Sequence, residues 1–266
     1  MSTSDGFSAG EGWVVITGAT GGLGASFART LAAEGRSLLL VGRNETALEG
    51  QAAELSGRFG VPVRPLIADL AEPAAVSDLV KQLNELDVDL LINNAGFAQH
   101  GPYEALDPAG QHDQLQVCVV ALADLAQGIA PQLVRRGRGG MINVASTAAF
   151  QPTPYLAAYA ASKAFVLSFS QALHDELQGK GVTVTALCPG PVMTGFWEQV
   201  GSTDAAFGQR LPANRVVAQG LDGFRRGQAV VVPGWRNVIT AQANRIIPRR
   251  LAVKIAGLAV RPRGRS

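Results

Sequence analysis

The sequence predicts an α/β fold in which one doubly wound parallel sheet is covered by helices on both faces. Two observations carry this prediction. Short, continuous apolar runs alternate with stretches of helical pattern almost from end to end, and a glycine-rich turn follows the first run. Strands that are apolar along their whole length are buried on both faces, as in parallel sheets. Right-handed crossovers between successive strands then define most of the topology.

Seven apolar runs are predicted as strands, and the stretches between them as helices. The first two helices are expected over residues 27–34 and 45–59. The strands are expected at residues 13–16, 37–41, 61–68, 89–93, 141–145, 183–188 and 229–232.

Length and composition agree with a globular protein of this class. The chain has 266 residues, of which 47% are hydrophobic and 17% charged, so it is too apolar for a disordered chain. No linker or internal repeat divides it, and we expect one domain over residues 1–266 with a basic tail from about residue 236. The net charge of +2 gives no indication of a nucleic-acid partner.

Cysteine, histidine and N-terminal patterns exclude several other classes. Two cysteines, Cys118 and Cys188, are too few for a disulfide framework or a cysteine-based zinc site. The three histidines lack metal-ligand spacing, so no metal is expected. The polar N-terminus has no signal or transit pattern, and no uninterrupted apolar run approaches the ~18 residues of a membrane span. These observations favour a cytoplasmic protein.

The glycine-rich turn predicts a nucleotide phosphate site. Residues 17–24 read Thr-Gly-Ala-Thr-Gly-Gly-Leu-Gly, directly after the first strand and at the start of a helix. Glycine allows a backbone to approach a pyrophosphate closely, and a helix N-terminus attracts the anion. The alternative is a plain strand–helix turn, but the position inside a strand–helix–strand unit favours a dinucleotide.

The end of the second strand indicates which dinucleotide. Gly42 leaves space there, and Arg43 supplies a planar cation suited to a 2′-phosphate, whereas NAD sites carry an acidic residue near this point. This favours NADP(H) over NAD. The alternative is a solvent-facing arginine that begins the next helix.

Two further strand ends are expected beside the cofactor. Asp69 follows the third strand and can accept a hydrogen bond from an adenine amino group, although an aspartate there is also an ordinary helix N-cap. The fourth strand ends in Asn-Asn-Ala-Gly, residues 93–96. Amides and small residues at a carboxyl edge suit a cofactor that passes close by, or a simple strand-to-loop turn.

Ser146, Tyr159 and Lys163 carry the predicted chemistry. Ser146 follows the fifth strand, and the spacing of Tyr159 and Lys163 places both on one face of a helix. A nearby ammonium is expected to lower the pKa of the phenol, so that the pair can exchange a proton with an alcohol or carbonyl oxygen. Ser146 can hydrogen-bond that same oxygen and orient it.

Together these motifs resemble the short-chain dehydrogenase/reductase family. The Thr-Gly-x-x-x-Gly-x-Gly turn, the Asn-Asn-Ala-Gly segment, Ser146, Tyr159-x-x-x-Lys163 and a Pro-Gly-x-Val-x-Thr segment at 189–194 match in order and spacing over about residues 12–235. The resemblance implies a Rossmann sheet of seven strands, a nicotinamide cofactor, and oxidoreductase activity on an alcohol or carbonyl substrate.

The resemblance also implies individual roles. Tyr159 would be the acid/base, Lys163 would hold the ribose hydroxyls and tune Tyr159, and Ser146 would orient the substrate oxygen. Thr194 would bind the nicotinamide carboxamide, while Asp69 and Asn93 would flank adenosine. The complete set of expected cofactor-binding residues is Thr17, Gly18, Thr20, Gly22, Leu23, Gly24, Arg43, Asp69, Leu70, Asn93, Ala95, Gly96, Tyr159, Lys163, Pro189, Gly190, Val192 and Thr194.

One position departs from the family pattern. Cys118 stands where the family usually has an asparagine that holds open a helix kink and anchors a water leading to the lysine. A thiol is a weak donor and acceptor and replaces an amide poorly. Cys118 is interpreted as a small buried residue; the alternative is a slowed or thiol-sensitive enzyme.

The substrate pocket is expected to be largely apolar. Residues near the motifs suggest a lipophilic ketone, aldehyde or alcohol as the small-molecule substrate. The alternative function is a cofactor-binding regulatory or partner protein with weak turnover, for which Cys118 is the only indication. The resemblance suggests a homodimer or homotetramer through helices near residues 111–134 and 157–177. The expected pocket residues are Phe97, Phe150, Gln151, Tyr155, Phe196 and Trp197.

The basic tail contains a predicted amphipathic helix. Residues 249–260 follow Pro248, and Leu251, Ile255 and Leu258 form one apolar stripe with cationic residues beside it. Ten basic residues and no acidic residue lie from 225 to 266. The pattern fits a helix docked on its own domain, one that covers a partner subunit or an acidic carrier protein, or one in weak contact with an anionic membrane surface.

Overall fold

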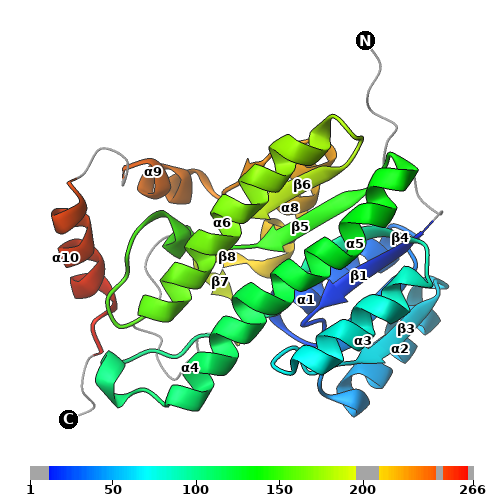
Figure 1. Cartoon of the computed structure of the whole chain (residues 1–266), viewed down its shortest axis with the longest axis horizontal. Coiled ribbons are helices and arrows are strands. Elements are labelled where there is room, and N and C mark those ends of the chain that lie inside the picture. Colours follow the sequence, from blue (N-terminus) through cyan, green and yellow to red (C-terminus); the bar gives the residue numbers. More distant parts are fainter. Residues whose placement is uncertain (1–11, 196–209, 244–247, 263–266) are drawn as a thin grey trace.

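A seven-stranded parallel sheet forms the centre of the protein (Figure 1). The computed structural model describes residues 12–195, 210–243 and 248–262. Strand order is β3-β2-β1-β4-β5-β6-β9, so the order reverses between β1 and β4, as in doubly wound sheets. The predicted strands are all confirmed. They are β1 (Trp13–Thr17), β2 (Leu38–Gly42), β3 (Val63–Ile67), β4 (Val88–Asn93), β5 (Gly140–Val144), β6 (Thr183–Leu187) and β9 (Val230–Val231).

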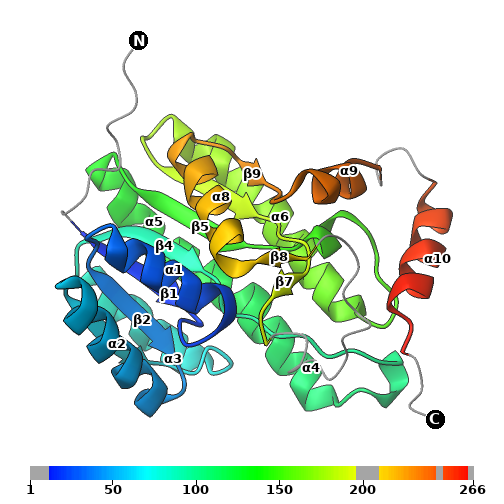
Figure 2. The same ribbon diagram turned by 180° about the vertical axis from the view of Figure 1, so that it is seen from behind.

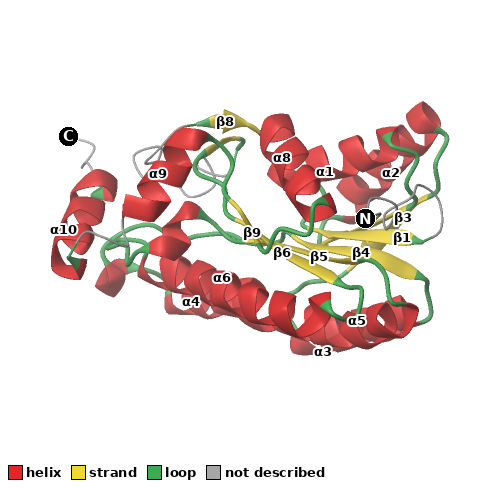
Figure 3. Cartoon of the chain, turned by 90° about the horizontal axis from the view of Figure 1, so that it is seen from above, coloured by secondary structure: helices red, strands yellow, loops and turns green. Residues whose placement is uncertain are grey.

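Helices cover both faces of this sheet (Figure 3). Alternate strand residues point to opposite layers, so Val14 and Ile16 belong to one apolar cluster and Val15 to another. One layer contains α1 (Gly22–Ala33), α2 (Glu45–Phe59) and α8 (Ala213–Arg225). The other contains α3 (Pro73–Asn84), α4 (Pro108–Leu115), α5 (Leu122–Arg136) and α6 (Ala157–Gln178).

Helix boundaries follow local chemistry. The Oδ1 atom of Asn44 accepts a hydrogen bond from the Ala47 N–H at 3.0 Å and caps α2, which ends at Gly60 in the left-handed region with φ +69°. Helix α1 begins at Gly22, five residues before its predicted start, because the glycine-rich turn supplies its first residues.

The longest helical stretch changes its hydrogen-bonding pattern in the middle. Between α4 and α5 the chain is π-helical over η2 (Gln116–Ala121). By length and composition alone, the stretch Pro108–Arg136 is apolar enough to cross a membrane. Core helices pass the same test, and here Leu125, Ile129 and Leu133 are buried in the cluster between α5 and the sheet.

Several short elements complete the fold. The strands β7 (Val192–Met193) and β8 (Leu211–Pro212) form a separate two-stranded parallel sheet that the sequence analysis did not predict. The 3-10 turns η1 (Tyr103–Ala105) and η3 (Thr147–Phe150), and the helix α9 (Trp235–Ala243), were also not predicted. The tail helix α10 (Arg249–Val260) is confirmed. Helices α9 and α10 lie at the end of the molecule away from β3 (Figures 1 and 2).

Candidate active site

A cleft of about 790 Å³ lies at the carboxyl ends of β1, β2, β4 and β5. This volume suits a small-molecule site, and the place is the crevice where doubly wound sheets bind ligands. Of the predicted cofactor residues, those that line it are Gly18, Thr20, Gly22, Leu23, Arg43, Asp69, Leu70, Ala95, Gly96, Tyr159, Lys163, Pro189, Gly190, Val192 and Thr194.

The glycine-rich turn provides a cradle in which Gly18, Gly21 and Gly22 place backbone at the cleft. Gly18 and Gly22 have φ angles of +62° and +55°, a region that glycine adopts without strain. No described side chain caps the start of α1, so its first N–H groups remain available to an anion. These residues therefore fit the pyrophosphate of a dinucleotide.

Three predicted cofactor residues lie behind the cleft rather than on its described lining. The hydroxyl of Thr17 accepts hydrogen bonds from the N–H groups of Asn94 and Ala95, both at 3.0 Å, and so joins two loops. A methyl group on Gly24 would lie 2.1 Å from the Gly18 carbonyl oxygen, so Gly24 permits close packing of α1. Asn93 is buried and donates to Asn143 at 3.0 Å. These residues shape the site from behind.

Arg43 and Asp69 form the far end of the cleft. The guanidinium of Arg43 lies 3.7 Å from a carboxylate oxygen of Asp69, and its side chain is 73% exposed. The other Asp69 oxygen accepts a hydrogen bond from the Ala71 N–H at 3.0 Å and caps a turn, whereas the N-cap of α3 is Glu72, so the alternative of an ordinary helix N-cap is wrong. An exposed arginine at this rim can reach a phosphate from the cleft side.

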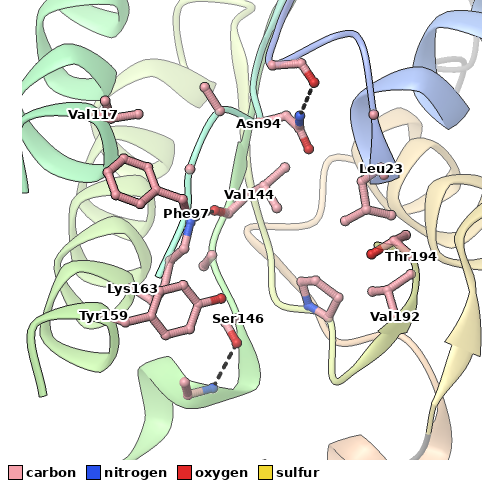
Figure 4. A pocket seen from close by; sticks show the side chains of 18 of the residues that line it. Leu23, Asn94, Phe97, Val117, Val144, Ser146, Tyr159, Lys163, Val192 and Thr194 are labelled. Atoms are coloured by element: carbon pink, nitrogen blue, oxygen red, sulfur yellow. Dashed lines mark hydrogen bonds between the residues drawn. The ribbon is translucent and has the colours of Figure 1, made fainter. Parts of the chain in front are cut away.

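Ser146, Tyr159 and Lys163 converge at the other end (Figure 4). The oxygen of Ser146 accepts a hydrogen bond from the Ala148 N–H at 3.1 Å, which fixes the side chain and leaves its proton to donate. The Lys163 ammonium donates to the Val144 carbonyl at 2.8 Å and lies 5.8 Å from the centre of the Tyr159 ring. Figure 4 shows the Tyr159 and Ser146 oxygens directed toward one another.

The pKa of Tyr159 moves in the direction opposite to the expected one. Burial raises the pKa of this phenol well above its ordinary value, and a hydrogen bond with Ser146 opposes the rise. Burial also disfavours the charged form of Lys163, and it therefore lowers the pKa of this ammonium. The expectation that the ammonium lowers the phenol's pKa is therefore wrong for the protein alone, because desolvation has the larger effect. With this direction of shift, the Tyr159 phenol is protonated at neutral pH.

Cys118 lies close to Lys163. A methyl group on Gly96 would lie 3.1 Å from the Cys118 sulfur and 3.5 Å from the Lys163 nitrogen, so both face this glycine. The thiol contacts the Phe97 carbonyl at 3.7 Å and is fully buried. Cys118 lies within the π-helical turn, so the helix is distorted here without an asparagine.

The remaining wall combines apolar and polar residues. Phe97 and Gln151 line the cleft as expected, whereas Phe150 and Tyr155 are not among the described lining residues, and Phe196 and Trp197 lie outside the described residues. Lining residues that the sequence analysis did not identify include Asp113, Val117, Thr153, Leu156, Asn237, Thr240 and Val260. The last three belong to α9 and α10. No sequence motif indicates where these two helices lie relative to the sheet.

Comparison with known proteins agrees with this geometry. The model of the short chain dehydrogenase family matches residues 12–205. The chain belongs to the short-chain dehydrogenase family. Members of this family are oxidoreductases that bind a nicotinamide cofactor, and in this chain the glycine-rich turn and the side chains of Ser146, Tyr159 and Lys163 line the same cleft.

Individual relatives show the range of this similarity. A very-long-chain 3-oxoacyl-CoA reductase from Anas platyrhynchos is 32% identical over 187 residues, 68% of this chain and 60% of the relative. A short-chain dehydrogenase from Sphingobium yanoikuyae in complex with NADPH is 33% identical, with a TM-score of 0.82 over 96% of this chain and 98% of that one. A bulky-bulky ketone specific alcohol dehydrogenase from Comamonas testosteroni is 27% identical, with a TM-score of 0.76 over 89% and 94%.

Proposed function

We propose that this protein interconverts a lipophilic ketone or aldehyde and the corresponding alcohol by hydride transfer with NADP(H). The observation that carries the proposal is the convergence of the Ser146 hydroxyl, the protonated Tyr159 phenol and the buried Lys163 ammonium at one end of a dinucleotide-sized cleft. Arg43 lies at the other end, three strands along the sheet.

Ser146, Tyr159 and Lys163 have separate roles in the proposed reaction. The bound cofactor supplies or accepts the hydride. Ser146 donates a hydrogen bond to the substrate oxygen. The Ala148 N–H donates to the Ser146 oxygen and so holds the serine side chain in position. Tyr159 gives its proton to the oxygen during reduction and takes it back during oxidation. Lys163 is anchored by the Val144 carbonyl and keeps further N–H donors for the cofactor's ribose.

Arg43 supports NADP(H) as the cofactor. No acidic side chain ends β2, because its last residue is Gly42 and the strand is followed by Arg43 and the helix-capping Asn44. The carboxylate of Asp69 keeps the Arg43 guanidinium beside the cleft. A similar structure was solved with NADPH bound. Replacing the phosphate by a hydroxyl would remove this charge-assisted contact and leave the guanidinium with Asp69 alone.

The cleft lining supports a substrate with a bulky apolar group. Phe97, Val117, Leu156 and Val260 contribute apolar surface near Tyr159, with Gln151 and Thr153 as polar contacts. The names of the relatives, a very-long-chain 3-oxoacyl-CoA reductase and a bulky-ketone dehydrogenase, agree with this class.

Assembly and location complete the proposal. Leu115, Val120 and Phe165 leave large apolar side chains exposed on the helical layer of α4, η2 and α6, which supports a homodimer or homotetramer through this face. Cys118 and Cys188 are buried free thiols, which suits a cytoplasmic location.

A substrate panel tests the function. Purified protein is mixed with NADPH or NADH and a series of ketones and aldehydes of increasing apolar size, and loss of the reduced nicotinamide absorbance is followed. We expect turnover with NADPH that improves as the apolar group grows. Binding of NADPH without turnover on any carbonyl would favour the alternative, a cofactor-binding regulatory protein.

A further inference from the structure

Helices α9 and α10 expose large apolar side chains at one end of the molecule. On α9, Trp235 is 65% exposed and Ile239 is 59% exposed. On α10, Leu251, Ile255 and Leu258 are 50%, 44% and 73% exposed. These five side chains are called the α9–α10 apolar surface below. Clusters of large exposed apolar residues mark interaction sites on folded proteins.

The exposure on α10 is a consequence of how this helix docks. Its small face, Ala252, Ala256 and Val260, is buried against the rest of the protein. Gly257 packs so closely that a methyl group on it would lie 3.1 Å from Pro154. At the end of the helix, the Val260 carbonyl lies 2.6 Å from the Nε2 atom of His100. The predicted apolar stripe therefore faces outward while the helix remains held.

Exposed cationic side chains lie on the same two helices. Arg236 lies on α9, and the exposed Arg249, Arg250 and Lys254 lie on α10, with exposed Arg261 directly after it. The described residues of these two helices include no aspartate or glutamate. At about 100° per residue, Lys254 and Arg261 flank the Leu251–Ile255–Leu258 stripe on the solvent side. Long cationic side chains in this position can reach phosphate groups while the stripe enters an apolar layer.

We propose that the α9–α10 apolar surface binds an anionic phospholipid bilayer, with α10 lying in the plane of the headgroups. An exposed aliphatic stripe flanked by lysine and arginine has the chemistry of an interfacial helix, and α9 exposes a tryptophan at the same end of the molecule. A symmetric contact with a second copy would bring the five cations of one surface against those of the other. An acidic carrier protein would match the cations but not the row of exposed aliphatic side chains.

The same two helices line the substrate end of the cleft. Asn237 and Thr240 of α9 and Val260 of α10 form part of its wall. A protein docked through this surface would hold the cleft beside the acyl region of the bilayer. A lipophilic carbonyl compound could then pass from the membrane toward Tyr159 without crossing water. This second step rests on the proposed function, whereas binding to the bilayer does not.

Vesicle cosedimentation tests the binding step. The full chain is mixed with vesicles of phosphatidylcholine and phosphatidylserine at about 7:3 and, separately, of phosphatidylcholine alone, at ~0.1 M and ~0.5 M salt. One variant carries Leu251→Ser, Ile255→Ser and Leu258→Ser. A second carries Arg250→Gln, Lys254→Gln and Arg261→Gln. The matched control, Arg29→Gln, Arg58→Gln and Lys180→Gln, removes three exposed charges elsewhere.

We expect the wild-type protein and the control to pellet with the anionic vesicles at low salt only. Losing three cations from the surface should weaken partitioning roughly a hundredfold, and losing the stripe by about tenfold or more. Wild-type protein that stays in the supernatant would overturn the proposal. So would stripe and charge variants that pellet like the control, or a stripe variant that changes the oligomeric state by size exclusion while leaving lipid binding intact.

Turnover tests the delivery step. The stripe variant should keep the wild-type rate on a water-soluble ketone and lose at least about fivefold in rate on a long-chain ketone held in anionic vesicles. Equal rates of the variant and the wild type on the vesicle-held ketone would refute delivery. If the wild type reduces neither ketone, the proposed function fails, and the cosedimentation result still decides binding.

Discussion

Replacing Arg43 with alanine should selectively weaken the binding of NADPH. A charge-assisted contact to a 2′-phosphate contributes ~1.5–3 kcal/mol. Because the Arg43 side chain is 73% exposed, solvent screening reduces this to about 1–2 kcal/mol. The dissociation constant for NADPH should therefore rise roughly 5- to 30-fold. The carboxylate of Asp69, 3.7 Å from the guanidinium, would also lose its partner and repel the phosphate.

The assay is a titration of both cofactors against wild type, Arg43→Ala and Arg58→Ala. Arg58 is an exposed cation on α2 that stacks on Phe59 and is not among the described cleft residues, so it controls for net charge. NADH affinity should change less than about twofold in either variant. Equal weakening of NADPH and NADH by Arg43→Ala, or no weakening of either, would show that Arg43 does not meet the 2′-phosphate.

Three further predictions follow from the same geometry. Cys118→Asn should leave kcat unchanged, because the π-helical turn already exists with the thiol; a higher kcat at unchanged KM would show that Cys118 limits the proton path. Gly24→Ala should lower the free energy of unfolding by ~1–3 kcal/mol or more, since the new methyl group would lie 2.1 Å from the Gly18 carbonyl oxygen. Gly57→Ala, which has open space around it, is the control in urea unfolding, and equal midpoints for the two variants would contradict this view of the turn. Because burial raises the pKa of Tyr159 above its ordinary value of ~10, the phenol stays protonated throughout neutral pH. The rate of reduction should therefore stay constant through neutral pH, and the rate of oxidation should rise with pH. A reduction rate that falls between about pH 6 and 8 would oppose this.

The sheet could be predicted from sequence because its strands are buried on both faces. The run Leu38–Gly42 has no polar side chain, and Leu90–Ile92 forms an apolar run within β4, so these strands can be predicted without knowledge of their packing. The strands Val192–Met193 and Leu211–Pro212 contain two residues each and are joined by a pairing distant in sequence. No periodic signal exists over two residues, so this small sheet appears only in three dimensions.

The tail helix shows what periodicity does and does not determine. The spacing of Leu251, Ile255 and Leu258 correctly predicts that they share one helix face. It does not determine which face is buried, and the protein buries Ala252 and Ala256 instead. Small side chains allow the helix to approach Pro154 closely, and this close approach depends on the tertiary structure.

The grouping of Ser146, Tyr159 and Lys163 was predicted from their spacing, whereas the direction of the Tyr159 pKa shift was not. Placing Tyr159 and Lys163 one helical turn apart follows directly from their separation in sequence. The direction of the phenol's pKa depends on how completely the protein excludes water from Tyr159, which is buried together with Lys163. Sequence also could not show that the hydroxyl of Thr17 and the amide of Asn93 form hydrogen bonds with other residues of the protein instead of facing the cleft.

In the proposed NADPH-dependent carbonyl reduction, Tyr159 transfers the proton. The most direct test compares Tyr159→Phe with wild type in two measurements on the same preparation, NADPH binding and single-turnover oxidation of NADPH with a ketone that the wild type reduces. The phenylalanine variant should bind NADPH with nearly unchanged affinity and lose turnover, because the hydroxyl serves the chemistry and not the dinucleotide. Turnover that persists at the wild-type rate would contradict the assignment of Tyr159 as the acid.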